Sequence, residues 1–187
     1  RWLEHTTHNR GVAGSSPASA TCNPEAPLRG LFRLIRETRT VVNPNVQGKK
    51  YPATDPYLVG REKIREFAHA VKSTNAMNLD VFAAQAAGYT DVIAPPTFAV
   101  VIQERSLATV LADPEADIDF SRVVHGDQRF IHARPIVAGD ELVSELEVAS
   151  VKSLGAHSMV TFETKIYDVD KELVCTAIST LVVRGDE

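Results

Sequence analysis

Residues 97–113 read TFAVVIQERSLATVLAD, and this stretch decides the fold. Its apolar residues recur at the spacing of one helical face, and Thr97 is a candidate N-cap. The residues expected to face inward are Phe98, Val101, Ile102 and Val110. Because the middle of this helix is rich in apolar residues, the sequence predicts that other elements wrap around it.

The wrapping elements are predicted in the C-terminal half. Four segments there have the alternation typical of strands: VVHGDQRFIHARPI (123–136), ELVSELEVASVKSL (141–154), HSMVTFETKIYDV (157–169) and LVCTAISTLVVRG (173–185). Turn residues lie between them: AGD (138–140), SLGA (153–156) and DVDKE (168–172). In the third strand, Val160, Phe162 and Ile166 alternate with polar residues, which predicts a sheet with one dry face.

Upstream of the central helix the chain is mainly helical. Residues 51–59 are predicted to be a short, proline-limited edge strand. Residues 61–72 have the pattern of an amphipathic helix, whose apolar face is Ile64, Phe67, Ala68 and Val71. Residues 78–88 form a second helix, with Asn78 as its N-cap and Gly88 just past its end. The prediction is a single α+β domain. Strands of this length suggest the hotdog architecture, a curved antiparallel sheet wrapped around a central helix, and another helix-on-sheet arrangement stays open as the alternative.

Residues 1–41 differ from the rest of the chain. They show no sustained periodicity, and Val41 and Val42, both compatible with a GTG start codon, directly precede the coherent part. We therefore expect a non-globular extension, with a mis-assigned start as its origin, followed by one domain at residues 42–187. The alternative is a basic targeting or membrane-surface segment within residues 28–42.

Composition limits the classes of function. Residues 42–187 carry 14 Lys and Arg against 21 Asp and Glu, which argues against nucleic acid as the main partner. No run approaches the roughly 18 apolar residues of a membrane helix, so no membrane partner is expected. Only two cysteines, Cys22 and Cys175, occur, which favours a reducing cytoplasm. Nucleotide-binding glycine motifs are absent and His125 and His132 lack zinc-site spacing, so no cofactor or metal is expected.

The loop KSTNAMNLD (72–80) joins the first two predicted helices and is rich in hydrogen-bonding groups. Before Asp80 it contains no side chain that titrates near neutral pH. Local chemistry explains Asn78 as a helix cap and Asp80 as a favourable charge in the first turn of a helix. Ser73 is interpreted either as a surface residue or as a contact to substrate or partner.

Several segments together resemble the MaoC-like hotdog (R)-specific hydratases and dehydratases: GREKIREFA (60–68), APPTF (94–98) and RPIVAGD (134–140). The similarity spans residues 46–184 and is strongest to the actinobacterial (3R)-hydroxyacyl-ACP dehydratase subunits. This resemblance implies the hotdog fold that the strand pattern already predicts.

Catalytic members of that family carry an Asp, then Asn-Pro, then a His five residues after the Asp, and these groups activate a water molecule. Laid onto this chain, Asn75 matches the Asn, whereas Ala76 takes the place of Pro. The Asp and His positions hold Ser73 and Asn78, which do not exchange protons near neutral pH. The resemblance therefore implies a subunit with a vacated active-site loop and no catalytic residue of its own.

The resemblance further implies a non-catalytic, substrate-channel subunit of a (3R)-hydroxyacyl-thioester dehydratase or enoyl hydratase in fatty-acid metabolism. Its expected partner is a catalytic MaoC-like hotdog chain in a heterodimer, with a homodimer as the alternative, and its expected substrate is an acyl-ACP or acyl-CoA. The residues expected to contact substrate are Asn75, Pro95, Pro96, Phe98, Val101 and Ile102.

Other functions stay open. One alternative is an independent hotdog enzyme, which is either an acyl thioesterase or a hydratase that uses His125 and Asp127. Residues i and i+2 of a strand point to the same face, so these two side chains could act together. The alternative is a surface pair beside a bulge at Gly126. A non-enzymatic acyl-thioester binding module is the third class. Candidate contacts to coenzyme A phosphates or an acidic carrier protein are Arg61, Arg65, Arg129 and Arg134.

Overall fold

A computed structural model describes residues 42–185, so the extension predicted for residues 1–41 lies outside the described part. The helices are α1 (Arg61–Ala70), α2 (Val81–Ala86) and α3 (Ala99–Leu111), with single 3-10 turns η1 (Pro44–Val46), η2 (Ala76–Asn78), η3 (Pro96–Phe98) and η4 (Phe120–Arg122). The strands are β1 (Tyr57–Leu58), β2 (Val123–His132), β3 (Glu141–Leu154), β4 (His157–Asp168) and β5 (Leu173–Val183).

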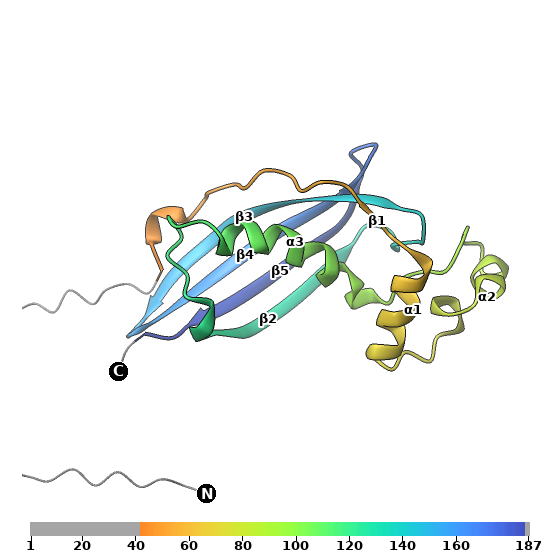
Figure 1. The fold of residues 1–187 in the computed structure, drawn as a ribbon, viewed down its shortest axis with the longest axis horizontal. Coiled ribbons are helices and arrows are strands. Elements are labelled where there is room, and N and C mark those ends of the chain that lie inside the picture. Colours follow the sequence, from red (N-terminus) through yellow and green to blue (C-terminus); the bar gives the residue numbers. More distant parts are fainter. Residues whose placement is uncertain (1–41, 186–187) are drawn as a thin grey trace, which may run out of the picture. The chain divides into compact units, whose positions relative to one another are not determined.

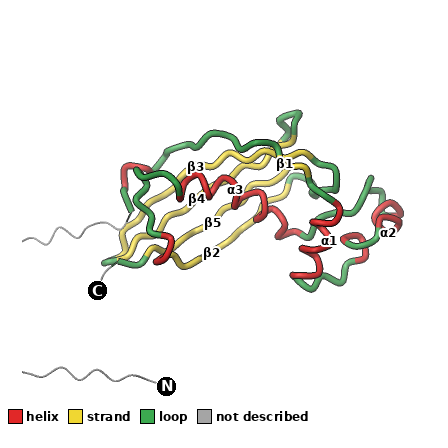
Figure 2. Tube along the Cα trace, in the orientation of Figure 1, coloured by secondary structure: helices red, strands yellow, loops and turns green. Residues whose placement is uncertain are grey.

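The strands form one antiparallel sheet in the order β1-β3-β4-β5-β2. The sheet curls around α3, which packs on β3, β4 and β5 (Figure 1). Helices α1 and α2 lie together at one end of the sheet, near the start of α3, whereas η4 lies at the opposite end (Figure 2). This is the predicted hotdog architecture.

The alternation of apolar and polar residues along the strands explains why one face of the sheet is buried. In β4, the alternate residues Val160, Phe162 and Ile166 are fully buried against the helix side, as predicted. The turns also lie where they were predicted. Gly139 and Gly155 adopt positive φ angles of 97° and 63°, which a residue without Cβ reaches at little cost.

Helix α3 begins differently from the prediction. Thr97 does not cap it, because the turn η3 runs directly into the helix and the N-cap residue, Phe98, makes no side-chain capping bond. Phe98, Ile102 and Val110 are fully buried as expected, whereas Val101 is only half-buried.

The first helices and the edge strand are shorter than predicted. Helix α1 ends at Ala70, so Val71 lies past the helix and is 46% exposed rather than on its buried face. The edge strand keeps regular pairing only at Tyr57–Leu58, although Tyr51 N still donates to Leu146 O of β3. Prolines at 52 and 56 remove donors from this segment, which accounts for the interruption.

A polar cluster ties the segment before β1 to the end of α3. Lys49 Nζ and Tyr51 Oη both donate to Asp113 Oδ2, over 2.7 and 2.6 Å, and Lys49 also contacts Glu115. These bonds, from Lys49 first and then Tyr51, lower the pKa of Asp113 to about 2. The ionised carboxylate is therefore the form that the folded chain favours.

This cluster predicts acid sensitivity. A carboxylate with a lowered folded-state pKa stabilises the fold fully above its unfolded pKa and loses that contribution as pH falls toward 2. We expect Asp113→Asn to lower the free energy of unfolding at pH 7 and to flatten its pH dependence between pH 4 and about 2. Urea unfolding across this range measures both effects. The matched control is Asp55→Asn, at an exposed carboxylate. An unchanged slope for Asp113→Asn would contradict the assignment.

Candidate functional site

The loop between α1 and α2 holds Ser73 and Asn78, the positions at which the resemblance predicts an acid and a base in catalytic members. Asn78 is 2% exposed, and its Nδ2 donates to the carbonyl of Ile93 over 2.8 Å. Its Oδ1 accepts a 2.7 Å hydrogen bond from the hydroxyl of Ser73. The backbone N–H of Ile93 in turn donates to Met77 O over 3.0 Å. The loop is therefore clasped to the segment around Ile93, and we call these bonds of Ser73, Asn78 and Ile93 the clasp.

The clasp changes the interpretation of Asn78. The prediction that Asn78 caps the second helix is wrong, because α2 begins at Val81. The N-cap of α2 is Asp80, whose Oδ1 accepts a hydrogen bond from Phe82 N over 2.9 Å. Asn75 instead caps the turn η2, with its Oδ1 accepting from Met77 N over 3.1 Å. Ser73, Asn75 and Asn78 thus each have a structural partner, and none of the three supplies a proton donor or acceptor with a pKa near neutral.

The other expected substrate contacts lie at the start of α3. Pro95 is buried and Pro96 is exposed. Phe98 and Ile102 have no exposed surface, and the ring of Phe67 packs edge-on against Phe98 with centroids 5.3 Å apart. In the single chain these two residues are core, so a contact between them and an acyl chain stays a prediction.

A histidine beside this turn was not singled out from the sequence. His132, the last residue of β2, lies 2.8 Å from Pro96 O through Nε2 and 4.0 Å from Cys175 Sγ. Burial raises the pKa of the Cys175 thiol to about 11, so the sulfur is protonated at neutral pH. Because a histidine N–H directed at a carbonyl cannot also accept a proton from sulfur, the pair is not a nucleophile with its base.

His125 and Asp127 do not form the pair that simple strand alternation predicts. The pairing of β2 with β5 shifts between them, so Gly126 is the site of a bulge. His125 Nε2 instead lies 3.2 Å from Gln128 Oε1. His125 and Gln128 line a pocket of about 220 Å³, and Asp127 is not among the residues that line it.

That pocket contains a buried amide that sequence reasoning missed. Gln103 on α3 is 2% exposed, and its Nε2 donates to Ser179 Oγ over 3.0 Å. Its Oε1 accepts from Gln128 Nε2, also over 3.0 Å. The side chains of His125, Gln128, Gln103 and Ser179 therefore form a continuous row of hydrogen-bonded groups from solvent to the sheet. We call this row the amide ladder. A glutamine within the apolar run of residues 97–113 was the only sequence signal for it.

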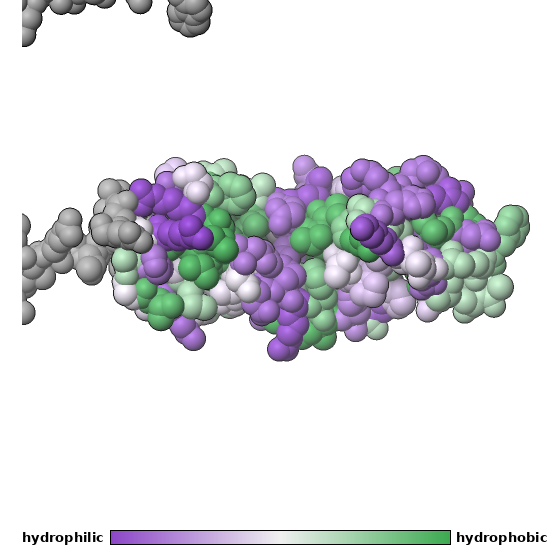
Figure 3. Space-filling model, turned by 90° about the horizontal axis from the view of Figure 1, so that it is seen from below, coloured by the Kyte–Doolittle hydropathy of each residue, from purple (hydrophilic) through white to green (hydrophobic). Residues whose placement is uncertain are grey.

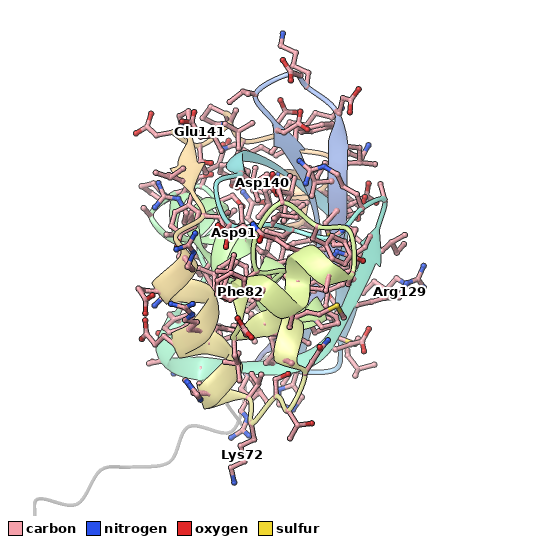
Figure 4. All side chains as sticks on the ribbon, turned by 90° about the vertical axis from the view of Figure 1, so that its right-hand side faces the viewer. Lys72, Phe82, Asp91, Arg129, Asp140 and Glu141 are labelled. Atoms are coloured by element: carbon pink, nitrogen blue, oxygen red, sulfur yellow. The ribbon has the colours of Figure 1, made fainter. Side chains whose placement is uncertain are left out.

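Three of the four candidate arginines have structural partners. Arg134 donates to Asp140 Oδ2 over 2.7 Å and to Asp168 Oδ2 over 3.1 Å, which joins the start of β3 to the end of β4. Arg61 pairs with Asp91 and lowers the pKa of that carboxyl group, and Arg65 donates to Leu79 O over 2.8 Å. Arg129 projects away from β2 (Figure 4), and no ion pair of its guanidinium occurs within residues 42–185. Of the four, Arg129 is the one free to meet an anionic partner.

Within residues 42–185, no group of three or more His, Cys, Asp or Glu side chains is arranged to hold a metal ion. None of the helices in this part of the chain is long and apolar enough to cross a membrane.

The chain is similar to several known proteins. Residues 45–177 match the family model described as the FAS1-like dehydratase domain region. A UPF0336 protein of Leifsonia xyli subsp. xyli is 64% identical over 146 residues, which cover 78% of this chain and 98% of the relative.

Solved structures agree with this family match. The C-terminally truncated HadBC (3R-hydroxyacyl-ACP dehydratase) complex from Mycobacterium tuberculosis aligns at 32% identity with a TM-score of 0.66, covering 73% of this chain and 96% of that one. A MaoC-like dehydratase aligns at 33% identity with a TM-score of 0.64, covering 75% of this chain and 42% of that one.

The clasp predicts a stability effect at Asn78. Asn78→Ala leaves the Ile93 carbonyl and the Ser73 hydroxyl without their partner, and we expect the free energy of unfolding to fall by about 1–3 kcal/mol. The control is Ser153→Ala on the exposed end of β3, expected within ~0.5 kcal/mol of the unsubstituted protein. Urea unfolding of both variants measures the difference. Equal stability of Asn78→Ala and the control would show that the clasp is not structural.

Proposed function

The chain belongs to the FAS1-like dehydratase domain family of MaoC-like hotdog proteins, and from this premise we propose that it is the non-catalytic subunit of a (3R)-hydroxyacyl-thioester dehydratase or enoyl hydratase. The observation that carries the proposal is the clasp, in which Ser73 and Asn78 bond to each other. These are the two positions that the resemblance assigns to the acid and base of the family. The complex would act in fatty-acid metabolism in the cytoplasm.

The chemistry of the proposed dehydration shows which catalytic groups this chain lacks. Dehydration of a 3-hydroxyacyl thioester removes a proton from C2 and expels the C3 hydroxyl as water, which leaves a trans-2-enoyl thioester, and hydration is the reverse. Both directions need a base and an acid within reach of one water molecule. Neither Ser73 nor Asn78 fills these roles, so a partner would supply both groups while this chain shapes the channel for the acyl tail.

A hotdog partner is supported by a solved relative and by the sheet. The HadBC dehydratase is a complex, and this chain is 32% identical to one of its chains. In this chain β2 is a ten-residue strand at the edge of the sheet. Val124 and Ile131 on it are 40% and 47% exposed. A long edge strand with apolar side chains is a surface on which another sheet can pair.

The face that contains this edge suits pairing in a second way. Seen from the β2 side, apolar areas lie among polar ones on the face in view (Figure 3). Phe120, immediately before β2, adds a ring that is 64% exposed. Because interfaces between separate chains are about as apolar as the rest of a protein surface, the mixture is compatible with pairing, and the exposed aromatic ring of Phe120 favours it. We therefore propose that the catalytic hotdog subunit pairs along β2 to form a heterodimer.

The proposal predicts that activity requires two chains. Neither this chain alone nor an intact-motif MaoC partner alone should match the turnover of 2-enoyl thioesters by the mixture, because the partner's site is completed only in the complex. The assay is hydration of crotonyl- and longer enoyl-thioesters, on coenzyme A and on carrier protein. Turnover by this chain alone would favour an independent enzyme, and acyl binding without turnover in the mixture would favour a binding module.

Edge variants provide the control for this assay. Ile131→Lys places a charge on the proposed interface, and we expect it to weaken association by ~10-fold or more, equivalent to at least ~1.4 kcal/mol. Leu154→Lys makes the same change at a residue that is 60% exposed in the β3–β4 turn, away from β2, and should leave association unchanged. Size-exclusion chromatography of the mixtures distinguishes the two.

A further inference from the structure

A polar layer divides the interior beneath α3. One apolar cluster lies toward the η4 end and includes Leu107, Val110 and Phe162, and the other lies toward α1 and includes Phe98 and Ile102. Between them the inward positions of the sheet and helix carry polar side chains, which are Gln103, Ser106, Ser144, Thr164 and Ser179.

This layer costs free energy that an apolar layer would not. Each buried polar group must recover its lost hydration through a hydrogen bond. Gln103 and Ser179 do so through the amide ladder, and Ser144 Oγ lies 3.3 Å from Ile102 O. Thr164 Oγ1 has no partner among the described residues. The ladder is therefore a feature that apolar packing alone does not require.

The pocket of about 220 Å³ ends at this layer. Its outer residues are exposed, with Glu104, Phe120 and His125 at the mouth. Its inner residues are Gln103 and Ser179, each 2% exposed. The walls between them are apolar and consist of Leu107, Val123 and Leu181. Because ligand pockets usually have about 300–1,000 Å³, this one suits the end of a chain-like ligand rather than a whole substrate.

The position of the pocket along α3 indicates how the pocket would face the partner chain. The clasp lies near the N-terminal end of α3, whereas the pocket residues Gln103 and Glu104 lie near the middle of the helix and Leu107 lies in its second half. Two similar sheets that pair edge to edge about a two-fold axis run in opposite directions. The partner's catalytic loop would then face the pocket end of this chain, and the mouth would open along β2.

Resting on the proposed function, we propose that this pocket receives the distal end of the acyl tail bound in the partner's site, and that Gln103 sets the upper limit of acyl length. An apolar tail gains free energy along the walls of the pocket and stops at the amide ladder. A longer tail has to separate Gln103 from Ser179 or Gln128 and leave buried polar groups without partners. Gln103 is thus a specificity-determining residue.

The test is the acyl-length dependence of kcat/KM for the heterodimer, measured with enoyl thioesters of increasing length. The unsubstituted complex should gain up to about fourfold per methylene, equivalent to about 0.8 kcal/mol, and then reach a plateau or fall. Gln103→Ala should shift this limit by about two methylenes, which raises kcat/KM about 15-fold for a substrate two methylenes longer than the limit of the unsubstituted complex. Short substrates, which do not reach the amide ladder, should be unaffected.

Two further variants make the outcome decisive. Thr109→Ala changes the exposed side of the same helix and should keep the original profile. Gln128→Leu breaks the amide ladder from the half-buried strand side and should shift the limit in the same direction, so it decides the question if Gln103→Ala does not fold. An active, folded complex with an unchanged length profile would overturn the role of Gln103 alone. Absence of activity on mixing would overturn the proposed function and this inference together.

Discussion

Burial of α3 against the concave face of the sheet is the constraint on which the other features depend. The helix can lose its apolar surface to only one side, so β3, β4 and β5 direct alternate residues toward it, and both apolar clusters form around it. The turns and the Lys49–Tyr51–Asp113 cluster then fix the ends of that arrangement. Because α3 is held so firmly, the loop between α1 and α2 and the turn η4 keep defined positions at opposite ends of the sheet.

Much of this fold followed from periodicity. The alternation in β4 and β5 and the spacing of Phe98, Ile102 and Val110 correspond to single-residue burial in the structure. Boundaries were less predictable, since prolines shortened the edge strand and α1 ended before Val71. Predicted helix caps were wrong where hydrogen bonds between distant segments competed with local capping bonds. Asn78 has the chemistry of an N-cap, yet its carboxamide is bound to Ile93, fifteen residues later in the chain.

The candidate site also has features that the sequence predicts and features that it does not. The resemblance predicts where the family's acid-base loop lies, and the sequence shows that neither Ser73 nor Asn78 is an acid or a base near neutral pH, because this depends only on residue identity. The sequence did not predict that these two side chains bond to each other, nor that Gln103 joins Gln128 and Ser179 beneath the helix. Such contacts join segments that are distant in sequence, and they depend on how the strands are registered. The arginines illustrate this too, since Arg134 organises the RPIVAGD segment rather than meeting a ligand.

The central claim is that this chain contributes no acid or base to the reaction. It is tested most directly by replacing the partner's motif histidine with alanine in the assembled heterodimer and measuring turnover of an enoyl thioester. If the loop at Ser73–Asn78 is catalytically empty, turnover falls by ~10²–10⁴-fold, because no second working site remains. Retention of about half of the activity would mean that this chain carries a functioning site, and would contradict the account.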